Sequence, residues 1–187
     1  MHTSTEAAAN EYAVLVVDDE EDVHDITRIS LRTLTHNGQR VKILSAQSAA
    51  EALEILRANP HIAVVLLDVV MESEHAGLDA CVAIRENLGN DLVRILLRTG
   101  QPGRAPEERV VREYSIDGYL PKAEQTSTRL LTMVRISLKA FDELCDLDTR
   151  RRSLESVHES VRELREESAW ADFQDENAFE FKGRNSS

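Results

Sequence analysis

The chain has 187 residues, of which 42% are hydrophobic, and 34 acidic against 22 basic residues give it a net charge of −12. This length accommodates one sizeable core plus an extension, and the negative charge disfavours binding to nucleic acid or an anionic membrane. No stretch approaches the roughly 20 apolar residues of a membrane span, and MHTSTEAAANEY lacks the parts of a signal peptide. Two well-separated cysteines predict neither a disulfide framework nor a zinc site. We therefore expect a cytoplasmic protein without a nucleic-acid or membrane partner.

Short apolar runs alternate with amphipathic stretches from residue 13 onward, which is typical of βα units that feed a parallel sheet. The runs predict five strands at 13–17, 41–44, 63–67, 93–98 and 117–120. The stretches between them predict four helices at 23–34, 49–56, 78–86 and 106–114. The pattern indicates an α/β fold with a doubly wound, five-stranded parallel sheet.

A long helix is predicted after Lys122, because 127–170 contains neither proline nor glycine. Its first part would bury Leu130, Leu131, Val134, Leu138, Phe141 and Leu144. Its second part carries a loose heptad of Leu147, Leu154, Val157, Val161 and Leu164, interrupted by Arg150, which favours a dimerisation or linker helix. The predicted organisation is a disordered N-terminus (1–11), one domain (12–145), a helical or coiled-coil extension (146–170) and an acidic, partly disordered tail (171–187).

Polar residues directly follow four of the five predicted strands. They are Asp18, Asp19 and Glu20 after the first strand, Asp68 after the third, Thr99 and Gly100 after the fourth, and Pro121 and Lys122 after the fifth. Ligands of doubly wound sheets bind outside the carboxyl ends of the strands, so we expect these residues to form one site.

The carboxylates of this site predict a Mg²⁺ ion, because three converging acids repel one another unless a cation lies among them. Asp68 follows the most apolar strand and is the best placed nucleophile for forming an acyl phosphate. Lys122 would pair with one phosphoryl oxygen, and the Thr99 hydroxyl would donate a hydrogen bond to another.

Four segments, VLVVDDEEDV, VVLLDVVMES, ILLRTG and DGYLPKAE, resemble the motifs of receiver domains in two-component response regulators, in the same order and spacing, over roughly 12–145. The resemblance implies a flavodoxin-like fold with strand order 2-1-3-4-5. It also implies that Asp18 and Asp19 are the acidic pair, Asp68 the phosphoacceptor, Val70 a backbone-carbonyl metal ligand, Thr99 the switch hydroxyl, Tyr119 the switch aromatic and Lys122 the phosphate-contacting lysine.

A receiver would accept its phosphoryl group from a histidine kinase or phosphotransfer protein and present a changed surface to a downstream protein. It would not be an enzyme beyond Mg²⁺-dependent self-phosphorylation and autodephosphorylation. RTGQPGRAPEERVVREY further resembles receivers that precede outputs such as cyclic-di-GMP phosphodiesterases. The chain departs from the common pattern at Glu72, where a proline usually follows the methionine, and at Ala123, where a proline usually follows the lysine.

Two other functions remain open. One is a Mg²⁺-dependent phosphohydrolase with Asp68 as nucleophile, although such enzymes usually carry a second acid where this chain has Val70. The other is a phosphate-independent adaptor that docks through the C-terminal helix, with a homodimer through that helix as a further expectation. Individually, Asp18 and Asp19 could be a helix cap and Tyr119 a packed strand residue. Val70 and Gln101 offer no carboxylate to orient a water, so we expect a persistent acyl phosphate.

Overall fold

The computed structural model describes residues 12–100, 114–122 and 126–182, with side chains as far as residue 165. The chain divides into two compact units between Glu143 and Leu144. The first unit contains a parallel sheet of β1 (Ala13–Val17), β4 (Lys42–Ala46), β5 (Ile62–Asp68), β6 (Arg94–Thr99) and β7 (Gly118–Pro121). Its order is β4-β1-β5-β6-β7. Counted along the chain this is 2-1-3-4-5, so the predicted fold is confirmed.

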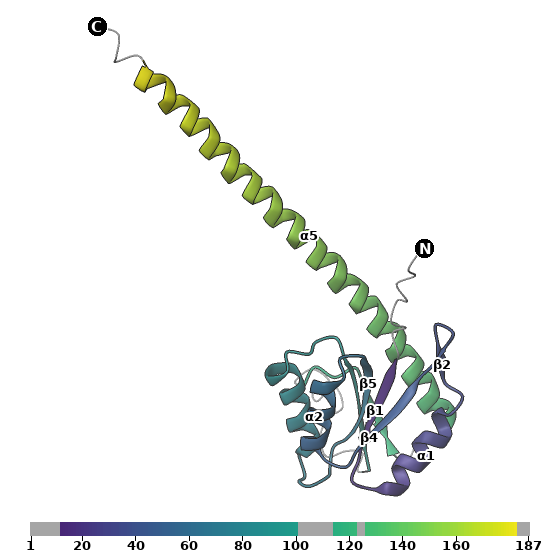
Figure 1. Ribbon diagram of the computed structural model, residues 1–187. Coiled ribbons are helices and arrows are strands. Elements are labelled where there is room, and N and C mark those ends of the chain that lie inside the picture. Colours follow the sequence, from purple (N-terminus) through teal and green to yellow (C-terminus); the bar gives the residue numbers. More distant parts are fainter. Residues whose placement is uncertain (1–11, 101–113, 123–125, 183–187) are drawn as a thin grey trace, which may run out of the picture. The chain divides into compact units, whose positions relative to one another are not determined.

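Helices cover both faces of this sheet. Figure 1 shows α1 (Glu21–Leu31) and the start of α5 (Ser127–Lys182) on one face. On the other face lie α2 (Ala49–Ala58) and α3 (Ala76–Val82), which is followed by the π-helical turn η1 (Ala83–Asn87). All seven residues of β5 are buried, because helices cover this central strand on both sides.

The inner face of α1 is more polar than its sequence suggests. Its buried residues are His24, Thr27 and Leu31, whereas Ile26 and Ile29 are 62% and 66% exposed. His24 and Thr27 lie on the first turns of the helix, beside the polar carboxyl ends of the strands. Ile26 and Ile29 are three residues apart, so they share an exposed face of α1.

A small hairpin that the sequence patterns did not predict precedes β4. It consists of β2 (Thr35–His36) and β3 (Gln39–Arg40). Asn37 and Gly38 connect the strands with positive φ angles of 49° and 78°, as a type I′ turn requires. His36 Nε2 lies 2.6 Å from Asp142 Oδ2, which fastens the hairpin to the first part of α5.

The first part of α5 closes the core over one face of the sheet. Leu130, Val134 and Leu138 are at most 2% exposed, and Leu131 and Phe141 pack against the same cluster. This confirms the predicted buried face as far as Phe141, whereas Leu144 is only partly buried and does not belong to this cluster. The helix predicted at 106–114 lies almost entirely outside the described residues, as do 1–11.

The second unit is the continuation of α5 from Leu144. The helix continues to Lys182, past the predicted end near residue 170, because 127–182 contains neither glycine nor proline. Its heptad residues Leu147, Leu154, Val157, Val161 and Leu164 are 48–71% exposed. Among the described residues, no helix is long and apolar enough to cross a bilayer.

Candidate functional site

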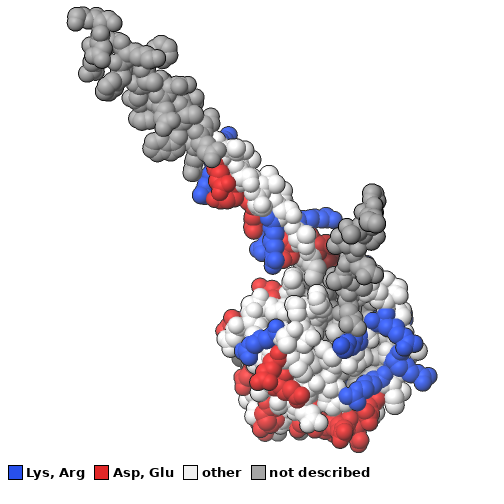
Figure 2. All heavy atoms as spheres, in the orientation of Figure 1, with Lys and Arg blue, Asp and Glu red and all other residues white. Residues whose placement is uncertain are grey.

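Strand alternation gathers charged side chains at one end of the sheet. Successive residues of a strand point to opposite faces. Val16, Leu66, Leu96 and Leu120 belong to the core cluster under α1 and α5. Each of these residues is followed two positions later by a charged residue on the same face of the sheet. In the same order, these charged residues are Asp18, Asp68, Arg98 and Lys122. The carboxyl ends lie at the lower edge of the folded body in Figure 1, where Figure 2 shows acidic side chains.

Lys122 connects the carboxylates of this site. Its Nζ lies 3.0 Å from Asp68 Oδ2, 3.1 Å from Asp18 Oδ2 and 3.1 Å from Glu20 Oε1. Asp18 is fully buried and Asp68 is 4% exposed, whereas Glu20 is exposed. The three sequence-predicted residues Asp18, Asp68 and Lys122 therefore meet at one point.

Burial and charge perturb the acid and the amine in this contact. Burial raises the pKa of Asp68, and the hydrogen bond and positive charge of Lys122 offset only part of that effect. Burial alone would lower the pKa of Lys122, but the hydrogen bond and charge of Asp68 outweigh it, so the pKa is raised. Lys122 therefore keeps its positive charge, and burial disfavours the ionised form of Asp68.

The same carboxylates fit a Mg²⁺ ion. One oxygen each of Asp18, Asp19 and Asp68 lies within 4.8 Å of the others. Asp18 Oδ2 is buried, and apart from the Lys122 ammonium 3.1 Å away it has no hydrogen-bond partner within the described residues, so it can also ligate a cation. Carboxylate oxygens are the ligands that Mg²⁺ prefers, and the ion keeps several waters in such sites.

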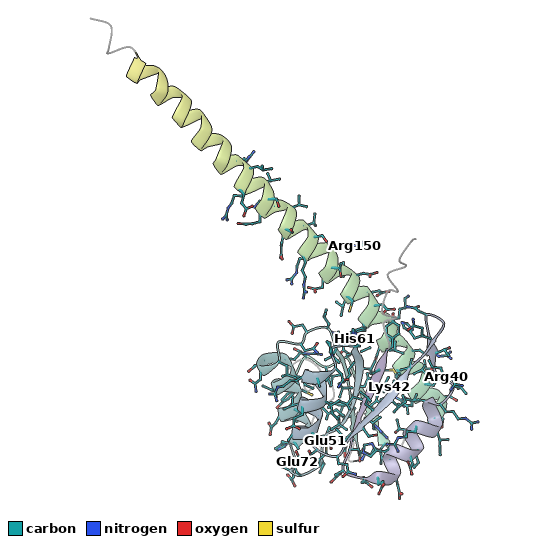
Figure 3. All side chains as sticks on the ribbon, in the orientation of Figure 1. Arg40, Lys42, Glu51, His61, Glu72 and Arg150 are labelled. Carbon is teal, nitrogen blue, oxygen red and sulfur yellow. The ribbon has the colours of Figure 1, made fainter. Side chains whose placement is uncertain are left out.

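The loop after Asp68 is fixed by hydrogen bonds to three elements. Val69 N donates to Arg98 O at 3.0 Å, and Gly77 N donates to Val69 O at 3.1 Å. Glu72 Oε1 accepts from Ala49 N at 3.2 Å, at the start of α2. Figure 3 labels Glu72 together with Glu51 of α2, whose carboxylate accepts from Gln47 N. Glu72 thus holds the loop where the common receiver pattern has proline.

Comparison with known proteins agrees with this geometry. Residues 14–135 match the family of the response regulator receiver domain. The chain belongs to the receiver family. It is also 43% identical over 149 residues, 80% of its length, to a 3'3'-cGAMP-specific phosphodiesterase 2 of Vibrio cholerae, of which it spans only 28%.

Solved receiver structures share the fold. A response regulator receiver domain protein from Clostridium thermocellum matches with a TM-score of 0.59 and 23% identity, over 71% of this chain and 98% of that one. The signal receiver domain of an HD domain-containing protein from Pseudomonas fluorescens matches with a TM-score of 0.63 and 19% identity, over 76% and 98%.

The two residues expected to form the receiver's switch lie on the other face of the sheet. Thr99 ends β6 and is 4% exposed. Tyr119 is partly buried against the cluster that contains Leu97, its partner in the strand register. Strand alternation puts Thr99 on the same side as Leu97. Val70, the expected carbonyl ligand, lies two residues after Asp68 and its side chain is 41% exposed.

Two residues of the receiver site were missed in the sequence. His24 is 3% exposed, and its Nε2 lies 2.8 Å from the carbonyl oxygen of Asp18, so it holds the first acidic loop. Arg98 is 4% exposed and donates to Thr27 Oγ1 at 3.1 Å. The available signal was the alternation of β6, which puts residue 98 on the face of Asp68.

A cavity of about 250 Å³ adjoins the site between α1 and the start of α5. Arg98 and Lys122 line it together with the hydroxyl residues Thr27, Ser30, Thr126 and Ser127 and the apolar residues Val23, Ile26 and Leu130. The two cations of the receiver site are therefore reached from this side as well as from the open end of the sheet.

Proposed function

We propose that this receiver accepts a phosphoryl group on Asp68 from a histidine kinase or phosphotransfer protein. Asp18, Asp19 and Asp68, with the backbone carbonyl of Val70, would hold Mg²⁺. The ion would neutralise charge on the phosphoryl oxygens. Lys122 would pair with one of those oxygens, and Thr99 would donate a hydrogen bond to another.

The convergence of Lys122 with Asp18 and Asp68 carries this proposal. A buried carboxylate whose pKa is raised and which has an amine 3.0 Å away is costly for a purely structural pair. Ionisable groups with pKa values perturbed by burial and a nearby charge are common at functional sites. The nearby acidic oxygens supply the second requirement, a place for the divalent cation.

Intact mass spectrometry tests the chemistry. The chain is incubated with acetyl phosphate with and without Mg²⁺, beside Asp68→Asn and, as a matched control, Asp79→Asn. A gain of roughly 80 Da that requires Mg²⁺ and Asp68 is expected. Equal labelling of Asp68→Asn, or no adduct from acetyl phosphate and from a panel of phosphorylated kinases, would refute the proposal.

We propose that the phosphodonor docks on the exposed isoleucines of α1. Ile26 and Ile29 lie on the helix that begins beside the acidic residues. An apolar patch next to a reactive aspartate suits a partner that must place a phosphohistidine there. Ile26→Lys is expected to slow transfer from a phosphorylated partner and to leave labelling by acetyl phosphate unchanged.

The output would follow from movement of Thr99 and Tyr119. Inward movement of Thr99 toward the phosphoryl group would free space for the Tyr119 ring and shift the population of conformers around β7 and α5. A downstream protein partner would read that surface. Tyr119→Ala is expected to keep phosphorylation and to abolish the phosphorylation-dependent change in partner affinity.

We also propose that the second part of α5 pairs with a second copy of the chain as a parallel coiled coil. Its exposed apolar residues recur with the spacing of heptad positions a and d. In a parallel pair, Asp146 at a g position of one helix would face Arg151 at an e position of the other helix. These two side chains have opposite charges and would attract one another. Arg150 occupies a d position and limits the strength of the pair; Figure 3 labels it on α5.

The similarity to the Vibrio cholerae phosphodiesterase supports a proposal about the pathway. Only 13 residues precede Val14, so the 149 matched residues include part of α5 beyond residue 135. We propose that this receiver controls hydrolysis of a cyclic dinucleotide, by a separate protein or an attached domain. Cells carrying Asp68→Asn should differ from wild type in cyclic dinucleotide level; equal levels under inducing conditions would refute the link.

The alternative of a phosphohydrolase is weaker. Such an enzyme needs a general acid beside its nucleophile, and the corresponding side chain here is Val70. Sustained Asp68-dependent turnover of a generic phosphate ester would favour it, whereas a single stoichiometric adduct supports the receiver.

A further inference from the structure

Arg98 is a buried cation in the proposed phosphorylation site, and the resemblance to receiver domains assigns it no role. It stands in register with Asp68 in the paired strands β5 and β6, so both side chains lie on the same face. Its side chain donates to Thr27 Oγ1 in α1, and its carbonyl oxygen accepts from Val69 N in the loop after Asp68. Arg98 therefore contacts α1, which begins directly after the Asp18–Glu20 loop, and the loop that follows Asp68.

The charge of Arg98 is retained despite burial. Burial lowers its pKa, and the negative charges of Asp18, Asp68 and Glu20 oppose that effect. A guanidinium is not deprotonated in proteins under ordinary conditions. The negative charges of these acids thus offset part of the desolvation cost of Arg98. In turn, the positive charge of Arg98 reduces the electrostatic repulsion among the acids.

A charge count gives Arg98 a specific role. Among the described residues of the site, the carboxylates of Asp18, Asp19, Glu20 and Asp68 face the cations Lys122 and Arg98, which leaves a net charge of about −2. One Mg²⁺ ion neutralises that charge. Without Arg98 the acids would attract the metal more strongly, but a phosphoryl group, which adds negative charge, would find one cation fewer.

We infer that Arg98 balances the charge of the site, weakening Mg²⁺ binding while stabilising the phosphorylated state of Asp68. This inference rests on the proposed phosphorylation of Asp68. It predicts two effects of opposite sign when the charge is removed. General damage to the site would instead weaken metal binding and phosphorylation together.

The test compares wild type with Arg98→Met, which keeps a long side chain without the charge. Calorimetric titration with Mg²⁺ alone should give roughly five- to tenfold tighter binding for the variant. The initial rate of labelling by acetyl phosphate at saturating Mg²⁺ should fall roughly tenfold. Arg98→Lys, which restores a cation, should return both quantities toward wild type.

Arg57→Met provides the matched control, because it removes an exposed cation of α2 and should change neither quantity. If Arg98→Met does not fold by circular dichroism, Arg98→Gln replaces it with the same expected results. Unchanged or weaker Mg²⁺ binding, or undiminished labelling, in a folded charge-free variant would overturn the inference. Failure of wild type itself to bind Mg²⁺ and accept phosphate would instead overturn the proposed function.

Discussion

Gly77 packs directly against the backbone carbonyl of Asp68. A Cβ atom at residue 77 would overlap that oxygen and lie 2.8 Å from Val69 Cα. Both obstacles are backbone atoms and cannot rotate away, so the start of α3 and the end of β5 would have to separate. This close approach keeps α3 next to Asp68, the proposed phosphoacceptor.

Gly77→Ala should therefore lower the free energy of unfolding by about 2 kcal/mol or more, as overpacking of rigid neighbours does. Urea unfolding followed by circular dichroism measures it. Gly100→Ala is the matched control, because nothing lies within 4 Å of a Cβ at that residue. Equal stability of the two variants would contradict the close contact.

Asp68→Asn should raise the melting temperature at neutral pH in Mg²⁺-free buffer. The pKa of Asp68 is raised from its ordinary value of 3.8, so the native state binds the proton more tightly than the unfolded state. Ionisation of Asp68 therefore costs stability above its native pKa, and this cost disappears as the pH falls below 3.8. We expect a gain of roughly 2–4 °C at neutral pH that vanishes in acid.

If Asp18, Asp19 and Asp68 hold Mg²⁺ as proposed, saturating Mg²⁺ should reverse that order, because an ion that binds the native wild type more tightly than the variant stabilises the wild type more. A destabilised Asp68→Asn variant at neutral pH without Mg²⁺ would mean that Lys122 compensates the burial of Asp68 completely. Differential scanning calorimetry over a pH series distinguishes these results.

Glu72→Ala should destabilise the domain by about 1 kcal/mol, since it removes the acceptor for Ala49 N at the start of α2. It should also slow labelling of Asp68, because the loop that follows the aspartate loses an anchor. Glu54→Ala, on an exposed position of α2, is the control. If Glu72→Ala had the stability and labelling rate of wild type, the hydrogen bond from Ala49 N to Glu72 would contribute to neither, and this prediction would be wrong.

Cys81 should resist thiol reagents until the domain unfolds. Its side chain is fully buried, and burial raises its pKa to about 12, so almost no thiolate forms near pH 8. In a Cys145→Ser background, the rate of labelling by a disulfide reagent should follow the rate or extent of unfolding in urea. Rapid labelling of the native domain would contradict this burial.

Arg150→Leu should strengthen self-association, because it places an apolar residue at the interrupted heptad position. Sedimentation equilibrium of the variant should give a dimer dissociation constant at least roughly tenfold lower than that of wild type. Val157→Lys should have the opposite effect, and Lys139→Ala, outside the heptad segment, should have none. Monomers in every case would refute the coiled coil.

The sheet and the acidic site were predictable because their signals are local. Apolar β-branched runs end in Asp18, Asp68 and Thr99, and the parallel order brings such endings together. The hairpin was missed because its strands have two residues each, although Asn37–Gly38 is a strong turn signal. The helix α5 extends beyond the predicted end near residue 170, and the acidic stretch that follows also lacks glycine and proline as far as Lys182.

The surroundings of the site were less predictable. Ile26 and Ile29 have helical spacing, yet α1 buries His24 and Thr27 instead, because its inner face meets the polar ends of the strands. In the sequence, nothing distinguishes Arg98 from the other basic residues. Only its position in β6 shows that its side chain lies on the same face of the sheet as Asp68. Which side chains become buried depends on which helices and strands pack against one another. The local pattern of a single sequence does not give this packing.

The alternation of side chains between the two faces of β6 also limits which insertions and deletions this strand can tolerate. Arg98 and Thr99 are consecutive but belong to opposite faces, one with the acids and the other with Tyr119. Deletion or insertion of a single codon within β6 would move the residues beyond it to the opposite face, so that the guanidinium would enter the apolar cluster and the carboxylates would lose their buried arginine. Length variation should therefore be tolerated in the connecting loops but not within this strand, even though neither residue would be lost.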